Sequence, residues 1–190
     1  MNEKTVGFAL CGSFCTFSKA IKQMKKLRDS GYAVLPIMSD VAFGTSTRFG
    51  KSEDIVSEIE RISGNSIIHT IVGAEPIGPK KMCDLLLVAP CTGNTLSKLS
   101  LGITDTPVTM AVKSHLRVKR PVLLCVATND GLGASAQNIG RLINTKNIYF
   151  VPLSQDNPRD KPSSLVADFE RIPESVEMAL SGIQPQPVYF

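Results

Sequence analysis

Residues 84–90, with the sequence DLLLVAP, form an apolar run that is too short for a buried helix and leads into small polar residues. Comparable runs occur at residues 5–11, 32–38, 66–72, 121–127 and 148–153. Strands that are buried on both faces of a sheet have continuous apolar sequences, and strands that alternate with helices pair in parallel. The sequence therefore predicts a three-layer α/β fold with a doubly wound parallel sheet.

Helical spacing of apolar residues predicts helices over residues 17–27, 52–63 and 134–144. Ser52 is a candidate N-cap, and Gly64 is a candidate stop. A further helix is expected over residues 164–180, broken or kinked at Pro173. Pro36 lies inside the second apolar run, which suggests an edge strand or a bulge there.

The chain has 190 residues, a net charge of +4 and a pI near 8.8. We expect one domain over residues 1–190, in which residues from about 152 to 190 form a C-terminal extension that packs on the rest. The mild basic excess is not that of a dedicated nucleic-acid binder. The lysines and arginines at 22–28 and 113–120 either form solvated surfaces or create a positive electrostatic field that attracts small anions.

Five cysteines, an odd number without a C-x-x-C pair, indicate reduced thiols in a cytoplasmic protein. The two histidines have no ligands at metal-binding spacing, so we expect no metal site. The first residues do not have the pattern of a signal peptide, and no apolar run is long enough to span a membrane. We therefore expect neither nucleic acid nor a membrane among its partners.

Small and polar residues follow four of the predicted strands, at the sheet edge where such folds bind ligands. They can donate and accept hydrogen bonds but are poor acids and bases, which favours a multiply hydrogen-bonded ligand such as a cofactor. Ser13 and Ser39 would face one point and hold a phosphate, whereas Asn94 or Thr95 can instead be a helix N-cap. The candidate binding residues are Gly12, Ser13, Phe14, Ser39, Pro90, Thr92, Gly93, Asn94, Thr95, Thr128 and Asn129.

The segment APCTGNTLSKLSLGITDTP resembles the P-A-S/T-A-N-T…A-x-G-x-x-D signature of the homo-oligomeric flavin-containing cysteine decarboxylase family, which includes the flavin prenyltransferases. The resemblance covers about the first 145 residues and implies a flavodoxin-like sheet, bound FMN and a homo-oligomer. It implies that Gly12, Ser13 and Ser39 bind the FMN phosphate. Pro90, Thr92, Asn94 and Thr95 would line the ribityl or ring region, and Asn129 would match the asparagine of the family's P-x-M-N motif.

The chain departs from this family at the catalytic positions. The decarboxylase histidine lies 14 residues before the motif proline, where this chain has Pro76, and His69 is seven residues too early. Thr128 replaces the methionine of P-x-M-N, and the prenyltransferase arginine–glutamate pair is missing.

The catalytic residues are therefore unknown from the sequence. Asp130 and His115 are candidate bases that are more typical of structural or solvated residues. Cys11 and Cys91 either have lowered pKa values near helix N-termini or are packing residues.

The segments VATNDGLGASAQNIGRL, FVPLSQDNPRDKPSSLVADF and GIQPQP resemble one branch, the B subunits of bacterial dipicolinate synthases. This resemblance implies an oxidoreductase subunit that oxidises dihydrodipicolinate, a small dicarboxylate, to dipicolinate in the mother cell during sporulation. An A subunit would be the partner and would carry NAD(P). Two alternatives stay open, a non-catalytic flavin-fold binding subunit and a divergent decarboxylase of the phosphopantothenoylcysteine type.

Overall fold

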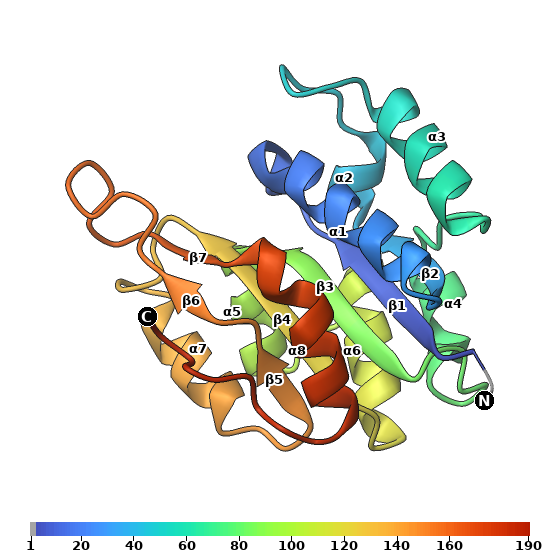
Figure 1. Ribbon diagram of the computed structural model, residues 1–190. Helices are drawn as coiled ribbons and strands as arrows, with labels where there is room; N and C mark the ends of the chain where they lie inside the picture. The colour runs from blue at the N-terminus through green and yellow to red at the C-terminus, as the bar shows by residue number, and fades with distance from the viewer. Residues whose placement is uncertain (1–2) are drawn as a thin grey trace.

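The computed structural model describes residues 3–190 and has three layers, with a seven-stranded sheet between helices (Figure 1). The parallel core of the sheet has the order β2-β1-β3-β4. These strands are β1 (Thr5–Leu10), β2 (Ala33–Met38), β3 (Leu85–Cys91) and β4 (Val122–Thr128). They coincide with four of the predicted apolar runs, and the flavodoxin-like doubly wound fold is confirmed.

Strand β2 lies at the edge of the sheet, as Pro36 predicts. The backbone of Ile68 bonds to the outer side of β2, because its N–H donates to the Pro36 carbonyl and its carbonyl accepts from the Met38 N–H. The nitrogen of Pro36 points to this same side, where no ladder bond to β1 is needed. The prediction of a full strand over residues 66–72 is wrong, since only Ile68 forms a bridge. Thr70 instead caps the short helix α4 (Ile71–Ala74).

The C-terminal part of the chain adds three short strands, and the sheet is not wholly parallel. The predicted strand 148–153 is two strands, β5 (Ile148–Phe150) parallel to β4, and β6 (Leu153–Ser154). Strand β7 (Leu165–Ala167) pairs antiparallel with both β4 and β6. The predicted helix 164–180 is therefore wrong in its first third. Pro173 does not kink a helix but lies in the first turn of α8 (Ile172–Leu180), where proline fits well.

Helices cover both faces of the sheet (Figure 1). Helices α1 (Phe17–Asp29), α3 (Ser52–Ser63) and α8 pack on one side, where α1 contacts the other two. Helices α5 (Gly93–Leu101), α6 (Pro107–Arg117) and α7 (Ala136–Ile143) pack on the other. Short helices complete the chain, namely η1 (Phe14–Thr16), α2 (Asp40–Gly44), η2 (Glu75–Ile77) and η3 (Phe169–Arg171).

The predicted end of α3 is confirmed, but its predicted N-cap is wrong. Gly64 ends α3 in the left-handed conformation, as predicted, but the N-cap of α3 is Lys51, and Ser52 is its first residue. The buried core runs through the whole sheet and includes Phe8, Met24 and Phe150. None of the described helices is long and apolar enough to cross a membrane.

A close backbone contact fixes η2 against α6. The Gly78 N–H donates to the Ser114 hydroxyl at 2.9 Å, and that hydroxyl donates to the Glu75 carbonyl at 2.6 Å. A Cβ atom on Gly78 would lie 1.8 Å from the backbone oxygen of Ser114, so no side chain fits without movement of the backbone.

We expect Gly78→Ala to lower the free energy of unfolding by about 1–3 kcal/mol, because overpacking forces the two backbones apart. Gly140→Ala is the control, since Gly140 lies within α7 with open space around it. That change is expected to raise the free energy of unfolding by about 0.5–1 kcal/mol through helix propensity. Urea denaturation measures both, and equal effects of the two changes would contradict the close contact.

Candidate functional site

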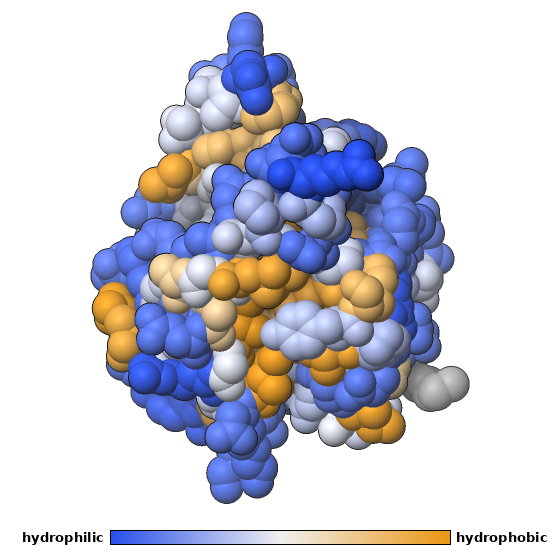
Figure 2. All heavy atoms as spheres, turned by 90° about the vertical axis from the view of Figure 1, so that its left-hand side faces the viewer, coloured by the Kyte–Doolittle hydropathy of each residue, from blue (hydrophilic) through white to orange (hydrophobic). Residues whose placement is uncertain are grey.

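The loops after the parallel strands meet at one edge of the sheet. The Ser39 N–H donates to the Leu10 carbonyl at 3.0 Å, and the Cys11 N–H donates to the Pro90 carbonyl at 3.2 Å. These bonds hold the ends of β1, β2 and β3 side by side. Figure 2 looks onto this side of the molecule, where apolar side chains gather in the middle of the face within a hydrophilic rim.

A first cavity of about 430 Å³ opens between the loops after β1, β2 and β3. Five of the predicted site residues line it, namely Gly12, Ser39, Thr92, Asn94 and Thr95. Sequence reasoning missed five other lining residues, Asp40, Val41, Lys98, Asp105 and Thr106. Lys98 lies four residues after Asn94, one helical turn along α5, and this spacing was the available signal.

A second cavity of about 240 Å³ lies on the other side of the Gly12–Ser13 turn. Three predicted residues line it, Ser13, Thr128 and Asn129. The other lining residues are Cys15, Thr16, Lys19, Ala127, Asp156, Lys161 and Val166. The structure therefore divides the predicted set between two neighbouring cavities.

Ser13 and Ser39, which were expected to face one point, line different cavities. The Ser13 N–H turns back onto the Cys11 carbonyl at 2.8 Å, and the Ser13 carbonyl accepts from the Thr16 hydroxyl at 2.8 Å. This tight turn directs Ser13 toward β4 and away from β2. Ser39 is buried and caps α2, where its hydroxyl oxygen accepts from the Ala42 N–H at 3.2 Å.

The first turn of α5 leaves donors free toward the first cavity. Its N-cap is Thr92, whose hydroxyl oxygen accepts from the Thr95 N–H at 3.3 Å, so neither Asn94 nor Thr95 is the cap. The first two N–H groups of a helix, here those of Gly93 and Asn94, have no intrahelical acceptor. The Asn94 side chain is exposed, and within residues 3–190 it makes no hydrogen bond. These groups are available to a ligand.

Gly93 is where the loop after β3 meets the loop after β4. A Cβ atom there would lie 2.6 Å from the Thr128 hydroxyl and 3.0 Å from Asp130 and from Ser135. The Asp130 carboxylate accepts from both hydroxyls, at 2.9 Å from Ser135. These bonds, first that from Thr128, lower the pKa of Asp130. Asp130 therefore stays ionised and fastens the loop, so the structure does not support it as a base.

Phe14 and Pro90 support the loops but do not line either cavity. Phe14 lies in η1, and its ring packs on Phe17 with centroids 5.2 Å apart. Pro90 is buried near the end of β3, where its carbonyl ties β3 to Cys11.

The other candidate groups are held in inert positions. Burial raises the pKa of Cys11 to about 11 and that of Cys91 well above its ordinary value, so both thiols are packing residues. His115 is buried near the start of β3, at the opposite ends of the strands from the cavities, with its Nδ1 atom 3.6 Å from the Cys83 sulfur. Burial lowers the pKa of His115 to about 4. His115 is therefore too far from the strand-end loops to act there.

His69 lies nearer to the strand ends than its spacing from Pro90 suggests. It directly follows the bridge residue Ile68, and its ring stacks on Phe43 of α2 with centroids 3.9 Å apart. Helix α2 begins at the first cavity, with Asp40 and Val41. Pro76, which occupies the sequence position of the decarboxylase histidine, lies instead in η2.

The sequence model of the family described as Flavoprotein matches residues 1–179. The chain belongs to the Flavoprotein family. It is 44% identical to the B subunit of dipicolinate synthase from Bacillus subtilis (strain 168) over 99% of this chain and 94% of the relative. A crystal structure of the dipicolinate synthase B subunit from Bacillus halodurans C matches with a TM-score of 0.90 and 45% identity, over 98% of this chain and 96% of that one. The resemblance to this branch is therefore confirmed.

A more distant member of the fold has also been solved. The structure of the FMN-dependent cysteine decarboxylase SpaF matches with a TM-score of 0.68 and 19% identity, over 95% of this chain and 96% of that one. At this identity the match bears on the fold alone.

The role of Asp130 can be tested through the pH dependence of stability. Because the folded-state pKa lies below its ordinary value of 3.8, the ionised carboxylate stabilises the fold above the ordinary pKa. That stabilisation is lost as the pH falls through the folded-state pKa. We expect Asp130→Asn to lower the free energy of unfolding at neutral pH, and the difference from wild type to shrink in acid. Chemical denaturation across this range measures it, and a difference that is constant with pH would contradict the assignment.

Proposed function

We propose that this chain is the flavin-binding component of a dipicolinate synthase, in which it binds FMN and contributes to oxidation of dihydrodipicolinate to pyridine-2,6-dicarboxylate. The observation that carries the proposal is a set of donors around the first cavity, the Asn94 amide and the first N–H groups of α5, that have no acceptor within residues 3–190. The name of the Bacillus subtilis relative supports the reaction, and its designation as a B subunit supports an A subunit as partner.

The residues of the first cavity fit a flavin nucleotide. Its volume lies within the range of roughly 300–1,000 Å³ that is usual for small-molecule sites. A helix N-terminus and a hydroxyl are the groups that commonly bind phosphate. The Ser39 hydroxyl uses its oxygen in capping α2 and keeps its hydrogen for an acceptor. Lys98 lies 2.9 Å from Asp105 at the same rim and offsets the charge of that carboxylate.

We assign the FMN phosphate to Ser39 and to the N–H groups of Gly93 and Asn94. Gly12 lets the chain pass close to the cofactor, and the Thr92 cap holds the first turn of α5 in place. When bound, FMN supplies the capacity to accept a hydride from the dihydropyridine ring. The work of the protein is then to bind and orient, which suits a site without a free acid–base pair.

The cellular setting belongs to the same proposal. We propose that the enzyme acts in the cytoplasm of the mother cell during sporulation, that this chain forms a homo-oligomer, and that the A subunit carries NAD(P). Reconstitution tests the reaction directly. The chain is loaded with FMN, combined with the A subunit, and followed by the ultraviolet absorbance of dipicolinate.

A loss of product when this chain is omitted supports a catalytic role. An A subunit that makes dipicolinate equally fast without this chain would remove that role. A second candidate, a binding subunit without chemistry, is favoured by the hydrogen bonds that engage Asp130 and by the departure from the family at Pro76. It predicts full activity with flavin-free chain. Carbon dioxide release from a cysteine-type substrate would instead support a decarboxylase.

Asn94→Ala is expected to weaken FMN binding by about 1–3 kcal/mol, because a buried polar group of the ligand loses its partner. Stability of the fold should change little, since Asn94 caps nothing. Fluorescence titration with FMN and thermal melting measure the two effects.

Asn138→Ala is the matched control, because its amide joins α7 to α5. Its Nδ2 donates to the Ser97 hydroxyl at 3.0 Å, and its Oδ1 accepts from Ser100 at 2.7 Å. We expect Asn138→Ala to lower stability by about 1 kcal/mol and to leave FMN affinity unchanged. Unchanged FMN binding by Asn94→Ala would place the ligand elsewhere.

A further inference from the structure

We propose that the second cavity binds a carboxylate of the dicarboxylate substrate, with Lys19 as the cation and Asn129 as the amide donor. This inference rests on the proposed function, which supplies the chemical class of the ligand. The substrate would then lie in the second cavity and the cofactor in the first. The residues come from three parts of the chain, the start of α1, the loop after β4 and the loop before β7.

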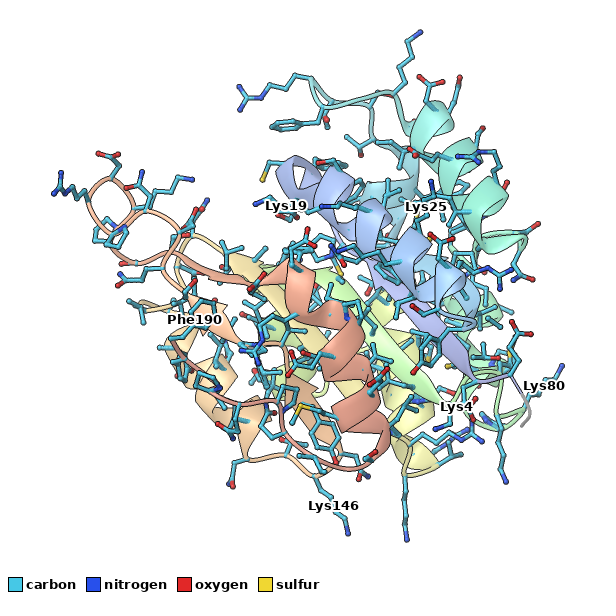
Figure 3. The ribbon with its side chains drawn as sticks, in the orientation of Figure 1. Lys4, Lys19, Lys25, Lys80, Lys146 and Phe190 are labelled. Carbon is cyan, nitrogen blue, oxygen red and sulfur yellow. The ribbon has the colours of Figure 1, made fainter. Side chains whose placement is uncertain are left out.

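Lys19 is the lysine of this cavity that has no ion pair. Among residues 3–190, its helix neighbours Lys22 and Lys26 both bind Glu170, whereas no carboxylate lies within ion-pair distance of Lys19. Figure 3 shows Lys19 near the start of α1, with Lys25 farther along the same helix. An ammonium that lines a cavity without a counter-ion is a ready partner for an anion.

The charged side chains that line the second cavity leave one positive charge, which one carboxylate would balance. Lys161 lies 3.5 Å from Asp156, so these two residues largely offset each other. Lys19 is then the uncompensated charge among the charged residues that line the cavity. A neutral ligand would leave the ammonium unpaired, and a ligand carboxylate would neutralise it.

The polar lining supplies a second donor. The Asn129 side chain is exposed, and within the described residues its amide makes no hydrogen bond. Thr128 is not available in the same way, because its hydroxyl donates to Asp130. A carboxylate accepts several hydrogen bonds, so an ammonium and an amide can both donate to it.

Size favours a small ring over a nucleotide. The second cavity, of about 240 Å³, is smaller than the roughly 300–1,000 Å³ that drug-sized ligands occupy. It lies beside the first cavity, because the adjacent residues Gly12 and Ser13 line one cavity each. A substrate held here would be next to the ligand of the first cavity, as transfer between two bound molecules requires.

The test compares Lys19→Gln with Lys25→Gln in the full chain loaded with FMN. Both changes remove one lysine charge from the exposed side of α1, but Lys25 does not line this cavity. Isothermal titration with pyridine-2,6-dicarboxylate measures binding, and a separate titration of the flavin-free chain with FMN measures the cofactor site. We expect Lys19→Gln to raise the Kd for the dicarboxylate at least about tenfold, as for loss of a charged hydrogen bond. Lys25→Gln should stay within about twofold of wild type.

Each other outcome overturns the inference. Wild-type affinity of Lys19→Gln for the dicarboxylate would show that Lys19 does not bind it. Equal losses of affinity in both variants would show that binding depends only on the overall positive charge of the protein. Weaker FMN binding by Lys19→Gln would assign Lys19 to the cofactor site instead. If the wild type binds FMN but not the dicarboxylate, the second cavity is not a substrate site, while the proposed cofactor role stands. Thermal melting shows that each variant is folded, and Asn129→Ala provides a second variant, for which the same selective loss is expected.

Discussion

Burial of β3 is the constraint on which the rest of the structure depends. All seven of its residues are buried, and it pairs in parallel with β1 on one side and β4 on the other. Parallel strands end at the same edge, so the loops after β1, β3 and β4 must emerge together. Backbone hydrogen bonds from Cys11 to Pro90 and from Ser39 to Leu10 then fix the loops after β1, β2 and β3 relative to one another. The arrangement of the strand-end loops therefore follows from the packing of the sheet and requires no ligand.

In two of these loops, the residues that hold the loop in place lie close to the residues that we propose as ligand contacts. Thr92 caps α5, and this leaves Asn94 free. Thr128 and Ser135 hold Asp130, whereas the Asn129 side chain makes no hydrogen bond in the part of the chain that the structure describes. Gly93 allows the two loops to touch, because any Cβ there would displace the Thr128 hydroxyl. In both loops, hydroxyl groups bond to the backbone or to a carboxylate, and a nearby asparagine side chain is exposed.

The parallel core could be predicted from the sequence, and eight of the eleven candidate residues line one of the two cavities, because both depend on local patterns. Continuous apolar runs identify buried strands, and small polar residues after them identify the ligand edge. The predictions for residues 66–72 and 164–168 are wrong because short apolar segments have similar compositions in several conformations, so the sequence alone does not separate a strand from a helix or an irregular segment. The separation of Ser13 from Ser39 also could not be predicted, because it depends on the backbone turn from Cys11 to Thr16. Lys98 and Lys19 lie on helices whose side chains reach the site from outside the loops.

The two cavities differ in which part of the chain builds them. The first is lined wholly by residues between Cys11 and Thr106, the part that resembles the wider flavin-containing family. The second also requires Asp156, Lys161 and Val166, which the C-terminal segment brings against β4 through the antiparallel strand β7. Gly131 allows this approach, because a Cβ there would lie 2.5 Å from Leu165. Under the two proposals, the cofactor site lies in the part of the chain that resembles the wider family, whereas the substrate site also includes the C-terminal segment and Lys19 near the start of α1. This division would let one fold keep its cofactor while its substrate changes.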